Sequence, residues 1–264
     1  MLILLHSSKT MRAQASKNTP TPLLFPEKTA ELGKYLKTLS LEQIQKTMKL
    51  SEPLAEKTRQ LIQDWTSTPP TNSLALDAFA GDIYSGLQAH TFSQKDRDYA
   101  NEHLRILSGL YGLLLPYNAI CPYRLEMGYR LPDPQFKNLY AFWSGSLAKT
   151  LPQSLVLNLA SEEYSKAILP FLDANRVISP QFLTCHPKTG KPSYVVVHAK
   201  IAKGAFARWM IQSQIQKPDQ LQSFTDLGYT FDPSLSTPQQ PAFICKEFGG
   251  KGLSIKKRAT VPST

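Results

Sequence analysis

Short apolar runs alternate along the chain with longer stretches in which apolar residues recur every three or four positions. Residues 2–5 form a compact apolar run, which predicts a buried first strand. Ser40 with Gln43 has the pattern of a capping box, and Ser51 is a second helix-start signal. We therefore expect helices over residues 27–39, from residue 41, and over 52–65, where one face carries Leu54, Leu61, Ile62 and Trp65.

After residue 73 the pattern changes to alternating strands and helices. The apolar residues 104–115 fit either type of element, and residues 186–192 read as the turn of a hairpin. Strands are expected at 74–79, 154–160, 177–185, 193–199 and 242–248, and helices at 94–103, 139–151, 161–168, 200–215 and 218–224.

No repeat and no break in composition divides the chain. We expect a single mixed α/β domain over residues 1–248, with a central sheet flanked by helices. Residues 249–264 are basic and contain glycine, and we expect them to form a flexible tail.

The composition is that of a globular protein, and no apolar run approaches the length of a membrane span. The apolar start is too short for the core of a secretory signal, so we expect a cytoplasmic protein that does not bind membranes. Cys121, Cys185 and Cys245 are far apart in the sequence, which argues against disulfides and against an activated thiol. Because no group of cysteines and histidines has metal-site spacing, we expect neither a metal nor a cofactor.

The net charge of +10 is concentrated in the last third of the chain. Residues 174–264 hold 12 basic and 4 acidic residues, against 18 and 16 in residues 1–173. Seven basic residues and no acid lie between Asp173 and Asp219, which favours an anionic partner such as nucleic acid. The alternative is a basic surface that serves only solubility.

Two phrases near predicted strand ends carry candidate ligand-binding residues. Lys9 and Thr10 follow the first strand, where α/β folds commonly bind ligands. Asp82 lies between glycines after the predicted strand at 74–79, and it either contributes to a site or caps the following turn.

The phrase PYRLEMG (122–128) holds opposite charges two positions apart. In an extended segment Arg124 and Glu126 share one face, and Tyr123, Leu125 and Met127 share the other. The charged pair is either a surface ion pair of at most about 1 kcal/mol or part of a polar site, and the specific phrase favours the site.

Polar residues also follow the predicted strand at 154–160. Together with Lys9, Arg124 and Glu126, we expect Asn158 and Ser161 to line a cleft suited to a nucleotide or a flipped base. Glu126 and Glu163 are the candidates for a general acid or base, although Glu163 could instead simply favour the first turn of a helix.

Two further features indicate DNA contacts. The turn LSGLYG loosely resembles a helix-hairpin-helix turn, in which Gly109 and Gly112 would offer backbone amides to phosphate; the alternative is a tight turn packed on Tyr111. On the predicted helix at 200–215, Lys200, Lys203 and Arg208 fall on one side.

Several longer phrases occur in a fixed order: FAGDIYSGL (79–87), LRILSGLYGLLLPYNAICPYRLEMG (104–128), LYAFWSG (139–145), NLASEEY (158–164) and GYTF (228–231). With HSSKT (6–10) and AKIAKG (199–204) they closely resemble the YaaA family of bacterial peroxide stress proteins, over nearly the whole chain. The resemblance implies one cytoplasmic α/β domain of unusual topology. It also implies protection from hydrogen peroxide, limitation of reactive iron, and DNA binding.

The chain departs from the family phrases at three places. Residues 6–10 replace Ser-Pro-Ala-Lys-Thr, Leu115 and Asn118 replace the Arg and Asp of Arg-Pro-Leu-Asp, and Lys203 replaces the Arg of Ala-Arg-Gly. The change at 115 and 118 removes one possible ion pair. Lys203 keeps the positive charge but loses the two-pronged grip of arginine on phosphate.

Two hypotheses of different kinds follow. The first is a monomeric protein that binds DNA largely without regard to sequence and helps limit iron-driven oxidative damage. The second is an enzyme that acts on a nucleotide or nucleobase in a polar pocket, with a nucleotide-like small ligand as partner. They differ in whether Arg124 and Glu126 face a closed pocket or an open basic groove.

Overall fold

Five strands form the main sheet of the protein, with the first strand of the chain at its centre. The computed structural model describes residues 1–12, 15–69 and 73–253. The order across the sheet is β5 (Gly112–Leu114), β4 (Leu104–Ser108), β1 (Leu2–His6), β6 (Val156–Asn158) and β7 (Val177–Ile178). Only the β4–β5 pair is antiparallel; the other three neighbouring pairs are parallel.

The strand β1 confirms the prediction of a buried first strand. All five of its residues are buried, as expected for a parallel strand in the middle of a sheet. Because β1, β4 and β6 are parallel, their carboxyl ends meet at one edge of the sheet, where the chain leaves β1 at His6.

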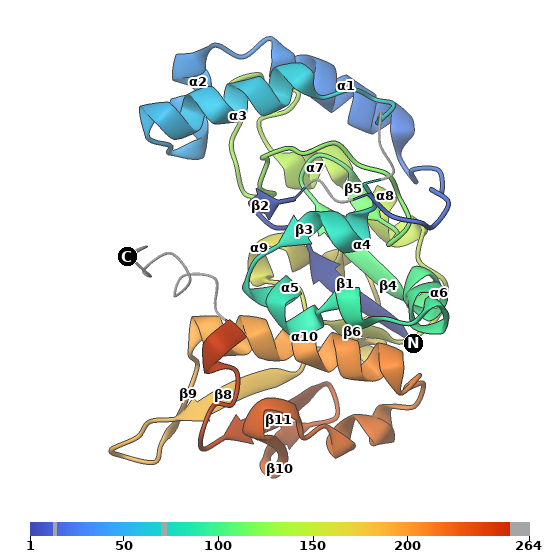
Figure 1. The fold of residues 1–264 in the computed structure, drawn as a ribbon, viewed down its shortest axis with the longest axis vertical. Coiled ribbons are helices and arrows are strands. Elements are labelled where there is room, and N and C mark those ends of the chain that lie inside the picture. Colours follow the sequence, from blue (N-terminus) through green and yellow to red (C-terminus); the bar gives the residue numbers. More distant parts are fainter. Residues whose placement is uncertain (13–14, 70–72, 254–264) are drawn as a thin grey trace.

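A second sheet lies on the other side of a long helix, α10 (Val196–Gln212). Its strands are β10 (Tyr229–Thr237), β11 (Gln240–Cys245), β8 (Gln181–Cys185) and β9 (Pro192–Ser193), in that order. Figure 1 shows α10 lying across the molecule, with the main sheet above it and the second sheet below it. α10 is therefore buried on most of its surface. The fold is a mixed α/β architecture with a central sheet and helices packed on it.

Two glycines allow α10 to cross a short helix, α5 (Asp82–Leu87), at backbone contact. A Cβ atom on Gly204 would collide with the carbonyl oxygen of Ile83, and one on Gly86 would collide with the carbonyl oxygen of Ile201. Neither position has room for a side chain. The crossing therefore holds the first half of α10 beside the segment that follows β1.

Three helices, α1 (Pro26–Lys37), α2 (Leu41–Met48) and α3 (Glu52–Asp64), form a layer at the top of Figure 1. The capping box of Ser40 and Gln43 is present and confirms that prediction. The predicted apolar face of α3 is only partly correct: Ile62 is buried, but Leu54 is exposed because α3 lies at the outside of the molecule.

The remaining elements are short. They are α4 (Ala75–Ala78), α6 (Gln94–His103), α7 (Leu139–Trp143), α8 (Ser146–Lys149), α9 (Glu162–Ser165), the antiparallel pair β2 (Thr10–Met11) and β3 (Phe79–Ala80), and the 3-10 helices η1 (Ala89–Thr91), η2 (Leu169–Phe171), η3 (Ala174–Arg176), η4 (Pro218–Ser223), η5 (Asp226–Gly228) and η6 (Lys251–Leu253).

Several predicted elements are wrong in type or extent, and three of them show the physical reasons. The expected strand at 74–79 forms α4 followed by the two-residue β3, because a short apolar run does not distinguish strand from buried helix. The expected helix at 139–151 is split into α7 and α8 at Ser144, whose φ is 45°. The expected strand at 193–199 ends at Ser193, and its three valines lead into α10, where packing of the whole helix overrides their strand preference.

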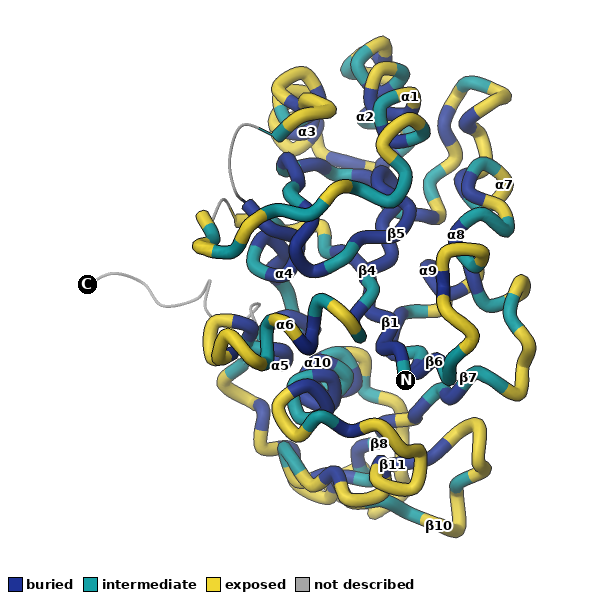
Figure 2. Tube along the Cα trace, turned by 90° about the vertical axis from the view of Figure 1, so that its right-hand side faces the viewer, coloured by how far each residue is buried: buried dark blue, intermediate teal, exposed yellow. Residues whose placement is uncertain are grey.

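The buried apolar residues form one connected cluster that extends from the α1–α3 layer to the second sheet. Figure 2 shows β1 buried in the interior, whereas most of β10 is exposed. No helix in the described ranges has both the length and the apolar character needed to cross a membrane. The predicted tail falls largely outside the described residues, which end at residue 253.

Candidate functional site

An open cleft lies where the chain leaves β1. It has a volume of about 570 Å³, and residues 6–10, the start of α5, Glu126, the start of α9 and Lys200 line it. Such a volume is within the range of small-ligand sites, roughly 300–1,000 Å³, and strand ends are the usual place for them in α/β folds. We call it the β1 cleft.

Glu126 is the centre of a hydrogen-bonded group in the β1 cleft. Its Oε2 lies 3.2 Å from Nζ of Lys9, and its Oε1 accepts a hydrogen bond of 3.0 Å from the hydroxyl of Tyr164. That hydroxyl in turn accepts a hydrogen bond of 3.2 Å from Oγ of Ser7. Two buried hydroxyl groups thus connect to a carboxylate whose side chain is 13% exposed.

The segment that carries Glu126 has the predicted alternation, but its ion pair has a different partner. Tyr123, Leu125 and Met127 are buried, while Arg124 and Glu126 are partly exposed. The interpretation of Arg124 as the partner of Glu126 is wrong, since the described residue that pairs with Glu126 is Lys9. A contact between distant segments is invisible in a two-residue spacing.

His6 lies beside this group as a neutral side chain. Burial, together with the nearby Lys203 and Lys200, lowers the pKa of His6 to about 3. The backbone N–H of Ser161 donates to Nδ1 of His6 (3.2 Å), which assigns the imidazole proton to Nε2. The ring stacks on Tyr164, with 4.8 Å between ring centroids. His6 is therefore a neutral residue of the cleft lining, with its proton on Nε2.

Lys200 and Lys203 supply positive charge from the first half of α10. Lys200 lines the β1 cleft, and Nζ of Lys203 donates to the carbonyl oxygen of Ala160 at 3.1 Å. Burial, with Lys200 close by, lowers the pKa of Lys203 to about 8. These two predicted DNA contacts are therefore near the predicted ligand-binding residues.

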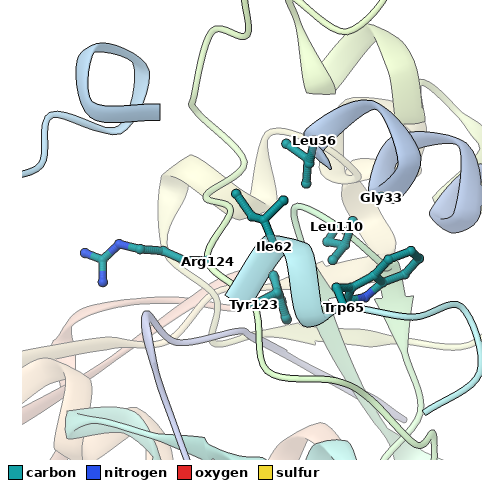
Figure 3. A pocket seen from close by; sticks show the side chains of 7 residues that line it. All are labelled: Gly33, Leu36, Ile62, Trp65, Leu110, Tyr123 and Arg124. Carbon is teal, nitrogen blue, oxygen red and sulfur yellow. The ribbon is translucent and has the colours of Figure 1, made fainter. Parts of the chain in front are cut away.

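Tyr123 and Arg124 lie outside the lining of the β1 cleft. They border a small apolar hollow beneath α1 and α3, together with Ile62 and Trp65. Figure 3 shows the guanidinium of Arg124 pointing away from the apolar side chains of this hollow. The hydroxyl of Tyr123 is 2.7 Å from Oγ of Ser108. Tyr123 thus anchors the segment that carries Glu126 to the end of β4, whereas Arg124 makes no such contact among the described residues.

The other predicted ligand-binding residues are divided between the cleft and its surroundings. Thr10, Asp82 and Ser161 line the β1 cleft, as does Glu163, which accepts a hydrogen bond of 2.9 Å from the backbone N–H of Gly128. Asn158 instead donates to Oγ of Ser179 at 3.2 Å and accepts from the backbone N–H of Ala160, which stabilises the end of β6.

The remaining predicted DNA contacts are already engaged within the protein. Gly109 and Gly112 are buried in the β4–β5 turn, where a Cβ would meet the backbone of Leu125 or the ring of Trp143. Arg208 pairs with Asp226 at 3.0 Å. This placement indicates packing for the glycines and charge neutralisation for Arg208.

The departure at Asn118 has a structural explanation. Asn118 is fully buried, its side-chain oxygen accepts from the backbone N–H of Leu115 (2.7 Å), and its amide donates to the carbonyl oxygens of Thr21 and Pro22. A neutral amide thus connects this turn to the chain before α1.

In the part of the chain that the structure describes, the cysteines and the acidic residues show no arrangement typical of thiol or metal chemistry. Burial raises the pKa of Cys245, and Cys121 is also buried. Within residues 1–12, 15–69 and 73–253, no group of three or more His, Cys, Asp and Glu residues is placed to hold a metal ion.

Sequence reasoning missed His6, Ser7 and Tyr164, which form the buried part of the site. His6 and Ser7 occupy positions where the family phrase has Ser and Pro. This departure is the sequence feature that could have indicated them as site residues. Tyr164 ends the phrase NLASEEY, but its orientation toward Glu126 depends on how α9 packs.

Comparisons with known proteins identify the family of the chain. Residues 1–235 match the family model described as "Peroxide stress protein YaaA". A "UPF0246 protein" of Salinispora tropica is 51% identical over 259 residues, which cover 97% of this chain and 98% of that protein. The chain therefore belongs to the YaaA family of peroxide stress proteins and has a role in peroxide stress.

Proposed function

We propose that the chain protects against peroxide damage by binding DNA, with the β1 cleft as the centre of the contact surface. The observation that carries the proposal is that Lys9 and Lys200 line one cleft of nucleotide size, with Lys203 close to Lys200 and His6. Lysine ammonium groups bind phosphate as point charges, and polar groups at strand ends suit a base or sugar.

A second group of lysines extends this basic surface. Lys188 and Lys191 are exposed in the turn between β8 and β9, and β9 leads directly into the first turn of α10, before Lys200. Contacts of this kind are mainly to phosphate, and they give binding that is largely independent of sequence. We propose a cytoplasmic monomer whose residues 1–248 act as one domain.

The same binding mode gives a physical route to limiting iron-driven damage. Each phosphate that a lysine neutralises releases its associated cations. Ferrous iron bound to the DNA backbone is one such cation, and its release moves the site of peroxide-driven radical formation away from the DNA. The protein then needs no iron site of its own.

The test is a salt titration of DNA binding, to a duplex and to a single strand of equal length, with the variant Lys200→Ala/Lys203→Ala. Each lost phosphate contact reduces the slope of log affinity against log salt by about 0.9 for a duplex and about 0.7 for a single strand, so two contacts are worth about twice as much. Arg59→Ala, an exposed residue on α3, is the matched control and should keep the wild-type slope. A slope that the double variant leaves unchanged for both forms of DNA would remove the β1 cleft from the contact surface.

A second candidate function is an enzyme that acts on a nucleotide or nucleobase, and the surroundings of Glu126 and His6 favour it. Tyr164 and Ser7 form a hydrogen-bonded path to the carboxylate, so Glu126 is placed to accept a proton relayed through hydroxyl groups. Neutral His6 is placed to donate a hydrogen bond to a carbonyl or ring nitrogen of the ligand.

Glu126→Gln separates the two candidates, because it removes the proton acceptor and keeps the shape of the side chain. If the chain is an enzyme, mass spectrometry of DNA or nucleotides incubated with wild type detects a released base or altered nucleoside, and the variant does not produce it. If the chain only binds, wild type yields no product, and Glu126→Gln binds DNA at least as tightly because it removes a negative charge from the cleft.

A further inference from the structure

We propose that the β1 cleft continues into a second hollow and that the two together bind a single nucleic-acid strand, with unpaired nucleotides in both. This inference rests on the DNA binding proposed above and specifies the form of DNA that the site takes. The second hollow has a volume of about 420 Å³ and lies on the far side of the first turn of α5. Gly81 and Tyr84 line both hollows, so the two adjoin.

Gly81 forms part of the boundary between the hollows and has no side chain there. Gly81 has a φ of 133°, and a Cβ at this position would lie 2.8 Å from Oγ of Ser8. A side chain is therefore unfavourable here for both backbone and steric reasons. Tyr84 lies beneath the boundary, and its hydroxyl donates to the carbonyl oxygen of His6 at 2.9 Å, which fixes its ring.

Positive charge is present in both hollows. Lys9 and Lys200 line the β1 cleft, and Arg12 lines the second hollow. The guanidinium of Arg12 forms no hydrogen bond or ion pair with another described residue. The acid of this hollow, Asp77, is already held by two guanidinium nitrogens of Arg97, the shorter contact being 2.6 Å. Arg12 is thus available to a phosphate.

The size of the hollows favours a single strand over a duplex. Each hollow has the volume of a small-ligand site, which fits a nucleotide but not a double helix. Phe79 and Tyr84 lie in the floor of the second hollow and are themselves buried, at 4% and 8% exposure. The unpaired nucleotides would therefore be held mainly through their phosphates.

The experiment compares a mononucleotide with a short strand. Anisotropy of labelled hexathymidylate, with thymidine monophosphate as competitor, measures both affinities for wild type, Arg12→Ala, Arg12→Lys and Arg59→Ala. We expect the strand to bind more tightly than the mononucleotide. Arg12→Ala should lower the salt slope for the strand by about 0.7 and leave the mononucleotide affinity unchanged. Arg12→Lys keeps the charge and should keep the slope, and Arg59→Ala should behave as wild type.

Each other outcome contradicts a defined part of the proposal. Equal affinities for mononucleotide and strand, or an unchanged slope in Arg12→Ala, would overturn the second hollow as a subsite while DNA binding stands. Tighter binding of a duplex than of a strand of equal length would overturn the single strand as partner. Absence of binding to strand, duplex and mononucleotide at low salt would instead overturn the proposed function itself.

Discussion

Lys200 and Lys203 lie in the first half of α10, and Arg208 lies in the second half of the same helix. All three are basic, and all three come from the acid-free stretch of the sequence. Arg208 meets a carboxylate, Asp226 of η5, at 3.0 Å, and its side chain is 17% exposed. Lys200 lines an open cleft close to the neutral His6. Lys203 lies nearby and donates a hydrogen bond to the backbone carbonyl of Ala160.

The difference between the two halves shows what a count of charges can and cannot locate. An excess of lysine and arginine indicates an anionic partner, but a charge that is already paired contributes little to binding it. Asp226 is distant enough in sequence that the stretch around Arg208 reads as purely basic. The fold alone determines which positive charges remain available.

The crossing of α10 over α5 positions the first half of the helix, and breaking it should have the largest effect. Gly204→Leu places a side chain where even a Cβ collides with the carbonyl oxygen of Ile83. We expect a loss of unfolding free energy of about 3 kcal/mol or more, since overpacking against backbone has no soft neighbour to move. Urea denaturation followed by circular dichroism measures it.

Gly252→Ala is the control for this experiment. Its Cβ would meet nothing within 4 Å, so its effect should stay within about 0.5 kcal/mol. Wild-type stability of Gly204→Leu would show that the first half of α10 is not held by the crossing, and the placement of Lys200 and Lys203 would need another cause.

The sequence predicts the elements of this fold better than their contacts. The buried strand β1, the capping box at Ser40 and the helix beginning after Ser93 are all present, because each depends on residues close in sequence. The predictions for 74–79 and 193–199 are wrong because local preference competes there with burial against distant elements.

The candidate site shows the same limit at the level of side chains. Alternation along 123–127 is predicted correctly, because a period of two is local. The partner of Glu126 is Lys9 and not Arg124, because that choice depends on how the end of β1 lies against a segment more than a hundred residues away. The hydrogen bonds that join Ser7 and Tyr164 to Glu126 depend on how α9 packs, which no local pattern in the sequence predicts.

The lowered pKa of Lys203 sharpens the comparison within α10 by making one of its charges depend on pH. The pKa is about 8 in the folded chain, against 10.5 for the free side chain. As the pH rises through 8, Lys203 loses its charge, and DNA affinity should fall with a salt slope smaller by about 0.9.

The stability of the fold should move in the opposite direction over this range. Between pH 8 and the ordinary lysine pKa, the unfolded chain holds the proton and the folded chain does not, so the contribution of Lys203 to stability rises with pH. Lys203→Arg, which stays charged, should remove the pH dependence of DNA binding, while Lys188→Arg should keep it. Equal pH profiles for wild type and Lys203→Arg would contradict a titrating lysine at the cleft.

Arg208→Ala should have the smallest effect, and it tests the other half of the helix. Because Arg208 is paired with a partly exposed Asp226, its loss should cost at most about 1 kcal/mol of unfolding free energy and leave the salt slope of DNA binding at the wild-type value.

Asp226→Asn is the informative partner variant, since it leaves Arg208 charged and unpaired. If the second half of α10 faces DNA at all, Asp226→Asn increases the slope by up to about 0.9, because an available positive charge has been created. If that half lies away from DNA, both variants bind as wild type does, and the contact surface ends near Lys203. A slope reduced in Arg208→Ala by as much as in Lys200→Ala would contradict the comparison, because the two halves of α10 would then contribute equally despite the pairing of Arg208 with Asp226.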